Sequence, residues 1–407
     1  MPNGKPYLGA LSQASADTGV ARVWRYDALG RLTEVDTQVG TEHFRLQRGY
    51  DELGRLRQVV YPTGFGYTHH YDSRGYLTEI RDLQHPALRY WQALHYDAQG
   101  RVPHAVLGNG LHRQRRYNAQ TDDLEWIGTG PDGTATVQND SYQYDALGNL
   151  QLRSEGVTGL VETFRYDGAN RLIEAKTHNG PSTTARYDEL GNLVYKSDVG
   201  IYIYGQGTRP HAVASIQGTV NATFSYDDNG NELRSNGRTT SWTSFNLPTS
   251  IQQGSYTDSY VYDLDHVRLK HITPQGSVIQ LNPRLDLGAH YEKDLRHGKV
   301  VHTSHVYAGN EAIAAVVEQD GQRDIRYLHT DHLGSITAVS NAQGKLTERL
   351  SYDAWGKRRN PDGSLNPGLS GQQTHHGFTG HEHLDEVGLI QLLRLILCHR
   401  QIQSRVG

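Results

Sequence analysis

The sequence predicts an all-β protein built from consecutive β-hairpins, and three observations carry that prediction. A Tyr-Asp unit, which is degenerate as Tyr-Asn at position 117, returns at intervals of 21 to 27 residues between positions 26 and 187. A fixed period of this length is typical of repeat architectures. Tyr and Gly are abundant, with 25 and 44 copies, whereas only 36% of the 407 residues are hydrophobic. Such a chain has little apolar material for a deep core. Aromatic residues also recur two positions apart, which places them on one face of a strand.

Each Tyr-Asp unit predicts a strand, a tight turn and a return strand. In YDALG at 26–30, Asp27 is expected to open a type I turn, and Gly30 to take the left-handed position that follows it. A type I turn with a left-handed residue closes a short hairpin with a bulge. The unit YDGAN puts Asn170 at the Gly position, and Asn is the next residue to tolerate this conformation. The predicted positions are Tyr26, Asp27, Gly30, Tyr50, Asp51, Gly54, Tyr71, Asp72, Gly75, Tyr96, Asp97, Gly100, Tyr144, Asp145, Gly148, Tyr187, Asp188, Gly191, Tyr226, Asp227, Gly230, Tyr352, Asp353 and Gly356.

The strand that leads into each turn carries paired aromatic residues. We expect these pairs to line up across neighbouring hairpins, where cross-strand aromatic contacts contribute roughly 0.2–1 kcal/mol each. The first interpretation of the tyrosines is therefore structural. An exposed aromatic stripe that binds glycan is the alternative. The pairs are Trp24/Tyr26, Tyr142/Tyr144, Phe164/Tyr166, Phe224/Tyr226 and Tyr260/Tyr262.

Composition argues against several classes of protein. The net charge of −4 lacks the basic signal of a nucleic-acid-binding protein. Cys398 is the single cysteine, so an intrachain disulfide framework is excluded. The apolar-rich stretch 388–398 is too short to span a bilayer and contains Arg394. The first residues show no charged start followed by an apolar run, so no signal peptide is predicted.

Histidine is abundant, with 22 copies, but the pattern predicts neither a metal nor a cofactor. His381 and His383 share one face of a strand and could both approach a zinc ion. No cysteine or spaced ligand set completes such a site. The chain also offers no converging acid, base and nucleophile, and Ser335 lacks the G-x-S-x-G frame of a hydrolase. We therefore predict that the chain is not an enzyme.

The repeat units resemble the YD repeats of the Rhs family. The segments VYAGNEAIAAVV, RYLHTDHLGSITAVSNAQGKLTERLSYDAWGKRR and GFTGHEHLDEVGLI resemble the Rhs repeat-associated core in order, and the resemblance spans about 20–390. It implies a curved or spiral sheet of hairpins, part of a hollow shell that encloses a variable C-terminal toxin. It divides the chain into a YD-repeat array at 1–280, the repeat-associated core region at 281–390 and an aberrant tail at 391–407.

The tail departs from the family pattern. The resemblance implies an autoproteolytic pair of aspartates, of which Asp385 matches the first, while residues 391–407 contain no Asp or Glu. One carboxylate cannot be both the ionised and the protonated partner, so we predict no self-cleavage. A shifted reading frame and genuine divergence both explain the tail. Its leucines at short helical spacings make 388–400 the best helical candidate of the chain.

These features favour a structural function. The chain is expected to be a shell segment of an Rhs-type polymorphic toxin whose C-terminal effector is missing, and with few hairpins it is expected to be a fragment or an open shell. The alternative is a YD-repeat module that binds cell-surface carbohydrate or a partner. The resemblance implies the toxin as partner, with secretion-apparatus proteins or surface glycans as further candidates. It also implies a secreted or cell-surface location.

Overall fold

The computed structural model describes residues 9–16, 18–178, 180–205, 209–281, 290–366, 370–392 and 395–398. Over these ranges the chain folds into β-strands and three short 3-10 segments, without an α-helix. Strands β1–β32 are assigned to one sheet, in which strands that follow one another pair antiparallel. The all-β prediction is confirmed. None of the described segments is a helix with the length and hydropathy to cross a membrane.

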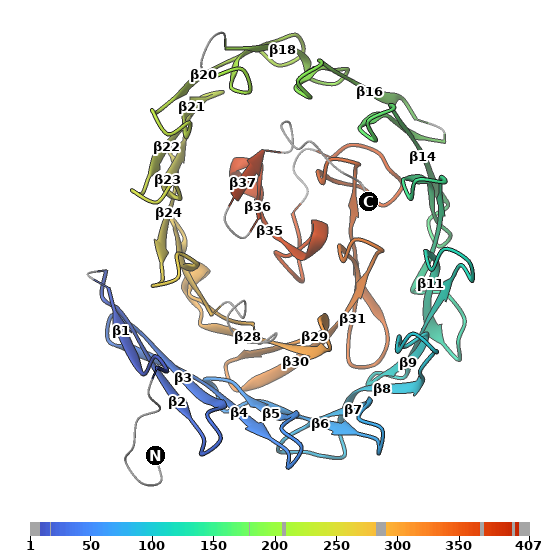
Figure 1. Cartoon of the computed structure of the whole chain (residues 1–407), viewed down its shortest axis with the longest axis vertical. Coiled ribbons are helices and arrows are strands. Elements are labelled where there is room, and N and C mark those ends of the chain that lie inside the picture. The colour runs from blue at the N-terminus through green and yellow to red at the C-terminus, as the bar shows by residue number, and fades with distance from the viewer. Residues whose placement is uncertain are drawn as a thin grey trace. The chain divides into compact units, whose positions relative to one another are not determined.

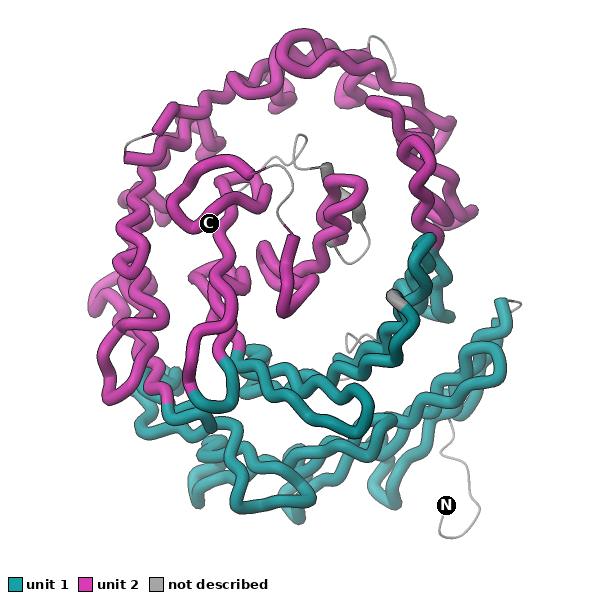
Figure 2. The backbone as a smooth tube through the Cα atoms, turned by 180° about the vertical axis from the view of Figure 1, so that it is seen from behind, with its two compact units in different colours: residues 1–110, 260–327, 341–343 teal, residues 111–259, 328–340, 344–407 magenta. Residues whose placement is uncertain are grey.

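The chain divides into two compact units that interleave along the sequence, coloured separately in Figure 2. Unit 1 comprises residues 1–110, 260–327 and 341–343, and unit 2 comprises residues 111–259, 328–340 and 344–407.

Unit 1 contains two runs of strands. The first run is β1 (Gln13–Ser15), β2 (Val20–Tyr26), β3 (Leu32–Val39), β4 (Glu42–Tyr50), β5 (Leu56–Val60), β6 (Gly66–Tyr71), β7 (Leu77–Asp82), β8 (Arg89–His95) and β9 (His104–Leu107). The second run is β24 (Tyr256–Tyr262), β25 (Arg268–Thr273), β26 (Gly276–Leu281), β27 (Tyr291–Asp294), the 3-10 segment η2 (Arg296–Gly298), β28 (Val301–Ala308), β29 (Glu311–Gln319) and β30 (Gln322–Thr330), of which β24 and β30 each cross a unit boundary.

The two runs of unit 1 pack face to face around an aromatic core. Burial alternates along β4, where Phe44 and Leu46 point inward, because successive side chains of a strand face opposite sides. Phe44 lies 6.1 Å from Tyr291 of the second run, ring centre to ring centre. The ion pair Arg22–Asp263 also joins the runs, at 2.7 Å. Figure 1 shows β4–β6 beside β28–β30. Each run thus covers the apolar face of the other.

Unit 2 begins with an uninterrupted series of hairpins and ends with shorter strands. The hairpin series is β10 (Leu111–Tyr117), β11 (Leu124–Pro131), β12 (Gln138–Tyr144), β13 (Leu150–Glu155), β14 (Leu160–Tyr166), β15 (Leu172–Thr177), β16 (Ser182–Tyr187), β17 (Leu193–Lys196), β18 (Gly200–Tyr204), β19 (Val213–Gln217), β20 (Ala222–Tyr226), β21 (Glu232–Ser235), β22 (Arg238–Trp242) and β23 (Pro248–Gln253). The later elements are β31 (Ile336–Ser340), β32 (Leu346–Arg349), β33 (Ser351–Tyr352), β34 (Arg358–Arg359), η3 (Phe378–Gly380), β35 (Glu382–Leu384), η4 (Asp385–Val387), β36 (Leu389–Leu392) and β37 (Leu395–Cys398).

The later segment of unit 2 lies against one face of its hairpin series. Arg349 donates to the Val137 carbonyl at 2.8 Å, and Arg359 forms an ion pair with Glu162 of β14. The Lys196 ammonium of β17 lies 4.1 Å from the centre of the Trp355 ring. These contacts bring side chains of the later segment, such as Arg359 and Trp355, next to residues of the hairpin series that are distant from them in the sequence.

The prediction of a helix at 388–400 is wrong. Leu389–Leu392 and Leu395–Cys398 are antiparallel strands, and β36 also pairs with β35. Leu389 and Ile390 are both buried, although neighbouring side chains of a strand face opposite sides. Both faces of β36 are therefore covered, and a short apolar run of this kind matches a helix and a buried strand equally well. The rest of the predicted aberrant tail, 393–394 and 399–407, lies outside the described residues.

Candidate functional site

The Tyr-Asp unit forms a five-residue turn, which the stretch from Asp27 to Arg31 illustrates. The Asp27 amide donates to the Arg31 carbonyl at 2.9 Å, and the Gly30 amide donates to the Asp27 carbonyl at 3.1 Å. The carboxylate Oδ1 of Asp27 accepts the amides of Leu29 and Arg31 at 2.9 and 3.0 Å. Gly30 has a φ of 79°, where a Cβ would be strained. The strand register shifts just before Tyr26, so the turn closes on a bulge.

The same geometry recurs in the other units whose residues were singled out from the sequence. Each aspartate amide donates to the carbonyl four residues later at 2.8–3.0 Å, and each aspartate carboxylate accepts the amide of that same residue. The glycines have φ between 76° and 93°. Asn170, which replaces Gly in its unit, has a φ of 58°. The aspartates are Asp27, Asp51, Asp72, Asp97, Asp145, Asp188, Asp227 and Asp353, and the glycines are Gly30, Gly54, Gly75, Gly100, Gly148, Gly191, Gly230 and Gly356.

Hydrogen bonds hold the Asp145 carboxylate of its turn in the ionised form. The Asn149 side-chain amide donates to Asp145 Oδ2 at 2.9 Å, and the backbone amide of Asn149 donates to Oδ1 at 2.9 Å. These donors lower the pKa of Asp145 below its ordinary value, the side-chain amide most strongly. The carboxylate therefore acts as a fixed acceptor at neutral pH and is committed to the turn.

The tyrosine of each unit ties its repeat to the preceding one. The Tyr187 hydroxyl donates to the Leu172 carbonyl at 3.0 Å, and Leu172 lies six residues after the preceding repeat's Tyr166. Tyr50, Tyr71, Tyr96, Tyr166 and Tyr204 make the same bond to Leu32, Leu56, Leu77, Leu150 and Leu193 at 2.5–3.0 Å. We call this series the tyrosine ladder.

Four further tyrosines extend or interrupt the tyrosine ladder. Tyr26 donates to the Leu11 carbonyl at 2.9 Å, and Tyr226 donates to the Val213 carbonyl at 2.9 Å. Tyr352 donates to Ile336 at 3.0 Å. Tyr144 lacks this bond within the described residues, and burial raises its pKa to about 12. The tyrosine ladder explains why Tyr recurs, because each hydroxyl of the ladder donates a hydrogen bond to a backbone carbonyl of the neighbouring repeat.

Arginine after the turn glycine forms a second link that the sequence reasoning missed. Arg31 Nε donates to Asp27 Oδ2 at 2.6 Å, and its guanidinium lies 4.7 Å from the ring centre of Tyr50 in the next repeat. Arg171 repeats this arrangement over Tyr187 at 4.8 Å. Arg stacked on Tyr is a favourable cation–π contact. The recurrence of Arg directly after the turn Gly or Asn was the available signal.

The last predicted unit, Tyr352 to Gly356, differs because it is buried in unit 2. Trp355 is only 2% exposed and lies against the Lys196 ammonium. Burial raises the pKa of Asp353, although Lys196 opposes this effect. This unit therefore packs as an internal contact of unit 2.

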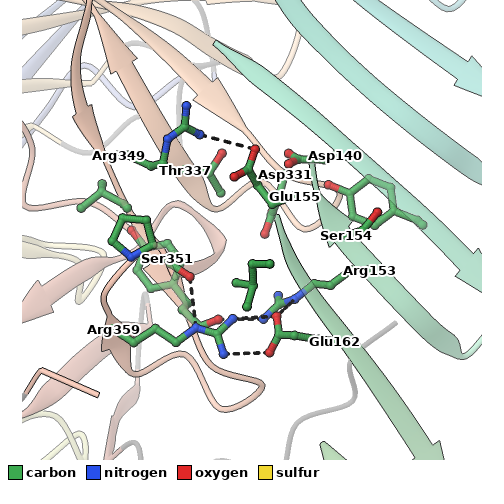
Figure 3. Close-up of a pocket in the computed structure, with 15 residues that line it drawn as sticks. Asp140, Arg153, Ser154, Glu155, Glu162, Asp331, Thr337, Arg349, Ser351 and Arg359 are labelled. Atoms are coloured by element: carbon green, nitrogen blue, oxygen red, sulfur yellow. Dashed lines mark hydrogen bonds and ion pairs between the residues drawn. The ribbon is translucent and has the colours of Figure 1, made fainter. Parts of the chain in front are cut away.

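A cluster of buried charges lies beside this unit, at strands β12–β14 (Figure 3). Arg359 Nη1 and Nη2 donate to the two Glu162 oxygens at 2.7 and 2.6 Å. Arg153 donates to Glu162 at 2.6 Å and to the Tyr352 carbonyl at 2.7 Å. Burial would raise the pKa of Glu162, but Arg153 and Arg359 outweigh burial and lower it to about 2. Glu162 is therefore ionised and saturated by two guanidinium groups.

The same cluster borders a cavity of about 60 Å³ that Asp140 lines. Asp140 Oδ2 accepts from the Gln138 amide at 2.8 Å. Burial raises the pKa of Asp140 to about 7, and the nearby Glu155 and Asp331 act in the same direction while Arg349 opposes them. A cavity of this size admits a few water molecules. Asp140 can therefore exchange a proton near neutral pH, but the cavity has no room for an organic substrate.

Asp385, the predicted remnant of the autoproteolytic pair, lies in η4 beside two basic groups. Its Oδ1 is 3.4 Å from Arg358 Nε and 3.9 Å from His383 Nδ1. Burial raises the pKa of Asp385, and the charge of Arg358 opposes that shift. Glu386 follows it in the chain.

The histidines considered as metal ligands make hydrogen bonds within the protein. His381 Nδ1 lies 2.8 Å from the Thr379 hydroxyl, and His383 Nε2 accepts the Phe378 amide at 3.1 Å. A further buried histidine, His329, has its Nε2 atom 2.8 Å from the Ser340 hydroxyl. These bonds give each ring a structural partner.

Unit 2 also contains an aromatic groove of about 970 Å³. Tyr226, Tyr204 and Trp242 line it together with the amide side chains of Asn231 and Asn246. Tyr226, one of the tyrosines considered for glycan binding, therefore lines this groove together with other aromatic and amide side chains.

Comparison with known proteins gives one family. The sequence model of the family described as teneurin YD-shell matches residues 13–231. Double-stranded DNA deaminase toxin A of Burkholderia cenocepacia (strain H111) is 23% identical over 386 residues, which cover 89% of this chain and 21% of the relative. Teneurin-3 of Danio rerio is 23% identical over 318 residues, which cover 75% of this chain and 10% of the relative.

A solved structure has a similar fold. The Photorhabdus luminescens Tc holotoxin pore matches with a TM-score of 0.73 and 15% identity over 95% of this chain and 22% of that chain. At this identity the match shows the fold alone. The chain spans about a fifth or less of the length of these relatives.

Proposed function

This chain belongs to the teneurin YD-shell family, and from that premise we propose that it forms a wall segment of a shell that encloses a C-terminal effector. The homology to a DNA deaminase toxin and the fold shared with a Tc holotoxin support this proposal. The effector would be supplied by sequence outside these 407 residues. Secretion-apparatus proteins are the further partners that such a role would require.

The tyrosine ladder is the observation that carries the proposal. A wall around a cargo must resist opening between neighbouring repeats, and backbone pairing alone leaves each repeat joined only along its strand. Each tyrosine hydroxyl of the ladder adds a hydrogen bond of roughly 0.5–1.5 kcal/mol to the preceding repeat. The stacked arginines reinforce the same junctions at Tyr50 and Tyr187. Such a ladder suits a mechanical role and leaves the tyrosines little freedom for catalysis.

The anchored later segment of unit 2 supports the enclosure part of the proposal. Arg359 and Arg153 both bind Glu162, and Trp355 is buried against Lys196. These contacts hold residues 351–361 against the hairpin series within unit 2. A cargo joined after this segment would begin next to the wall. In this role the chain has no turnover of its own.

Protease protection of a fused reporter tests the enclosure. A small folded domain with an exposed protease site is joined to the C-terminus of the full chain, and the same domain is joined to the N-terminus as the matched control. We expect the C-terminal reporter to be cut much more slowly than both the N-terminal one and the free domain. Cleavage of the C-terminal reporter at the rate of the free domain would overturn the enclosure role.

Carbohydrate binding is the second candidate, and the aromatic groove of unit 2 favours it. Trp242 and Tyr226 with the amides of Asn231 and Asn246 combine stacking faces with hydrogen-bonding groups. A glycan array probed with the full chain tests this function. Binding that is lost in Trp242→Ala, but kept in Tyr195→Ala outside the groove, would support it. Absence of binding to every glycan on the array would contradict carbohydrate binding as a function.

A further inference from the structure

A cavity of about 460 Å³ lies between the hairpin series of unit 2 and its later segment. Val199, Ile216 and Phe224 form an apolar wall on the side of the hairpin series, and residues of η4 line the cavity from the later segment. The volume is in the range of small-molecule sites in proteins. Arg238 lines both this cavity and the aromatic groove beside it. We call it the Gln253 cavity, after the residue that contributes an unsatisfied polar atom to it.

Gln253 supplies a hydrogen-bond acceptor that no donor of the described chain reaches. Its side-chain oxygen Oε1 is buried, and none of the described residues donates a hydrogen bond to it. Gln253 is among the residues that line the cavity. A buried oxygen without a donor is unfavourable, so such atoms in proteins usually have a water molecule or a ligand as partner. An N–H group of a ligand in the cavity would satisfy this oxygen.

Lys357 and Glu386 bring two opposite charges to the same cavity. Both side chains line it, and both residues are exposed. They form no ion pair with each other, and neither has an ion-pair partner within the ranges that the structure describes. A single ligand that carries both a carboxylate and an ammonium group would match this pair of charges.

The other charged side chains of the cavity already have partners within the protein. Lys196 Nζ donates to the two Asp198 oxygens at 2.6 and 2.7 Å. Arg238 Nη2 donates to Glu232 Oε1 at 3.2 Å. Asp353 Oδ1 accepts two backbone amides of its own turn at 2.8 and 2.9 Å. The two exposed charges are therefore the ones left for a ligand.

We propose that the Gln253 cavity binds a free amino acid with an apolar side chain. The carboxylate of this ligand pairs with Lys357, and its ammonium group donates to Glu386 and to Gln253 Oε1. The apolar side chain of the ligand packs against the apolar wall of the cavity. A neutral sugar or a simple anion would leave at least one of the two charges without a partner. This proposal is independent of both the enclosure role and carbohydrate binding.

Isothermal titration calorimetry of the full chain with L-phenylalanine tests the proposal. Three analogues each lack one feature of this probe: phenylpropionate lacks the ammonium group, phenylethylamine lacks the carboxylate, and glycine lacks the apolar side chain. Phenylalanine is expected to bind at least about tenfold more tightly than each analogue, because each analogue loses one charge-assisted or apolar contact. Absence of phenylalanine binding, or an analogue that binds as tightly, would overturn the proposal.

Substitutions in the cavity separate the contributions of the two charges. Lys357→Gln should weaken phenylalanine and phenylpropionate about tenfold and leave phenylethylamine unchanged. Glu386→Gln should weaken phenylalanine and phenylethylamine by a similar factor and leave phenylpropionate unchanged. Gln253→Met removes the acceptor at similar volume and should change the binding of the three ligands in the same direction as Glu386→Gln. A merely structural role of these side chains would not produce this dependence on the ligand.

The matched controls are Lys176→Gln and Glu189→Gln, which remove the same charges from exposed residues of unit 2 outside the cavity. Both controls should bind phenylalanine like the wild type, and the melting temperature of every variant checks that it is folded. Cavity variants that bind all ligands like the wild type would overturn the proposal. Controls that lose phenylalanine binding to the same extent would overturn it as well. The protease-protection and glycan-array results do not depend on these outcomes.

Discussion

Arg359 and Glu162 lie 197 residues apart in the sequence and form a bidentate ion pair. Each of the two side chains is 4% exposed. Arg153 completes the pair from a neighbouring strand at 2.6 Å. Charges this deeply buried are tolerated only when they are paired and hydrogen-bonded. The pair therefore holds the later segment of unit 2 against its hairpin series.

Replacing Glu162 by Gln is expected to destabilise the chain by about 3–5 kcal/mol, because Arg153 and Arg359 would remain buried without their counter-charge. Urea denaturation of the wild type and the variant measures this change. Arg165→Gln is the control, since it breaks an exposed pair with Glu174 worth roughly 0–1 kcal/mol. Equal effects of the two substitutions would contradict the importance of the buried pair.

The raised pKa of Asp140 predicts that the free energy of unfolding depends on pH. The pKa of its carboxyl is about 7 in the folded chain, against an ordinary value of 3.8. Between these values the folded chain retains a proton that the unfolded chain has lost. The contribution of Asp140 to the free energy of unfolding therefore falls as the pH rises from about 4 to about 7, by roughly 1 kcal/mol per pH unit, and is level above that range.

Asp140→Asn should remove this slope, so the difference in stability between variant and wild type grows in favour of the variant from pH 4 to 7. Denaturation series at several pH values measure that difference, which separates Asp140 from Glu155, Asp331 and every other titrating group. Parallel curves for the two proteins would rule out the raised pKa.

Tyr187→Phe tests one step of the tyrosine ladder. It removes the hydroxyl that donates to the Leu172 carbonyl and leaves the ring in place. We expect a loss of roughly 0.5–1.5 kcal/mol in the free energy of unfolding. Tyr195→Phe is the control, because the Tyr195 ring lies under Arg186 and its hydroxyl has no protein partner in the described part of the chain. A similar loss in the free energy of unfolding in both variants would contradict a stabilising role of the tyrosine ladder.

Gly148→Val tests the turn. Gly148 has a φ of 81°, and a Cβ added there would meet no atom within 4 Å, so any penalty comes from the backbone conformation. Thermal or urea denaturation should show a loss of about 1–3 kcal/mol. Gly148→Asn should cost less, since Asn170 adopts this conformation in an equivalent turn. Equal stability of the Gly148→Val and Gly148→Asn variants would contradict a penalty from the backbone conformation at this position.

Asp385 predicts that the purified chain does not cleave itself. Its Oδ1 lies beside Arg358 and His383, and the second aspartate of the expected pair has no counterpart in 391–407. Intact mass spectrometry after prolonged incubation should show one species for both the wild type and Asp385→Asn. A shorter product that forms in the wild type and disappears in the variant would demonstrate autoproteolysis.

The sequence by itself determined the repeat and its turns. The bonds that define a turn join residues no more than four positions apart, such as Asp27 and Arg31, so local residue types suffice to predict them. The period also determined the all-β class. The role of the tyrosine could be narrowed to structure, but its carbonyl acceptor could not be named, because that acceptor belongs to the neighbouring repeat.

Only the tertiary structure decided the contacts between distant segments. Nothing near Glu162 or Arg359 in the sequence distinguishes them from exposed charges, since burial depends on the path of the whole chain. The strands at Leu389–Leu392 and Leu395–Cys398 were mistaken for helix because a short apolar run fits both conformations until its hydrogen-bonding partners are known. Trp355 and Leu29 hold the same position in their turns, yet one is buried and the other exposed. Local chemistry shapes each hairpin, whereas packing within each unit decides which side chains are covered.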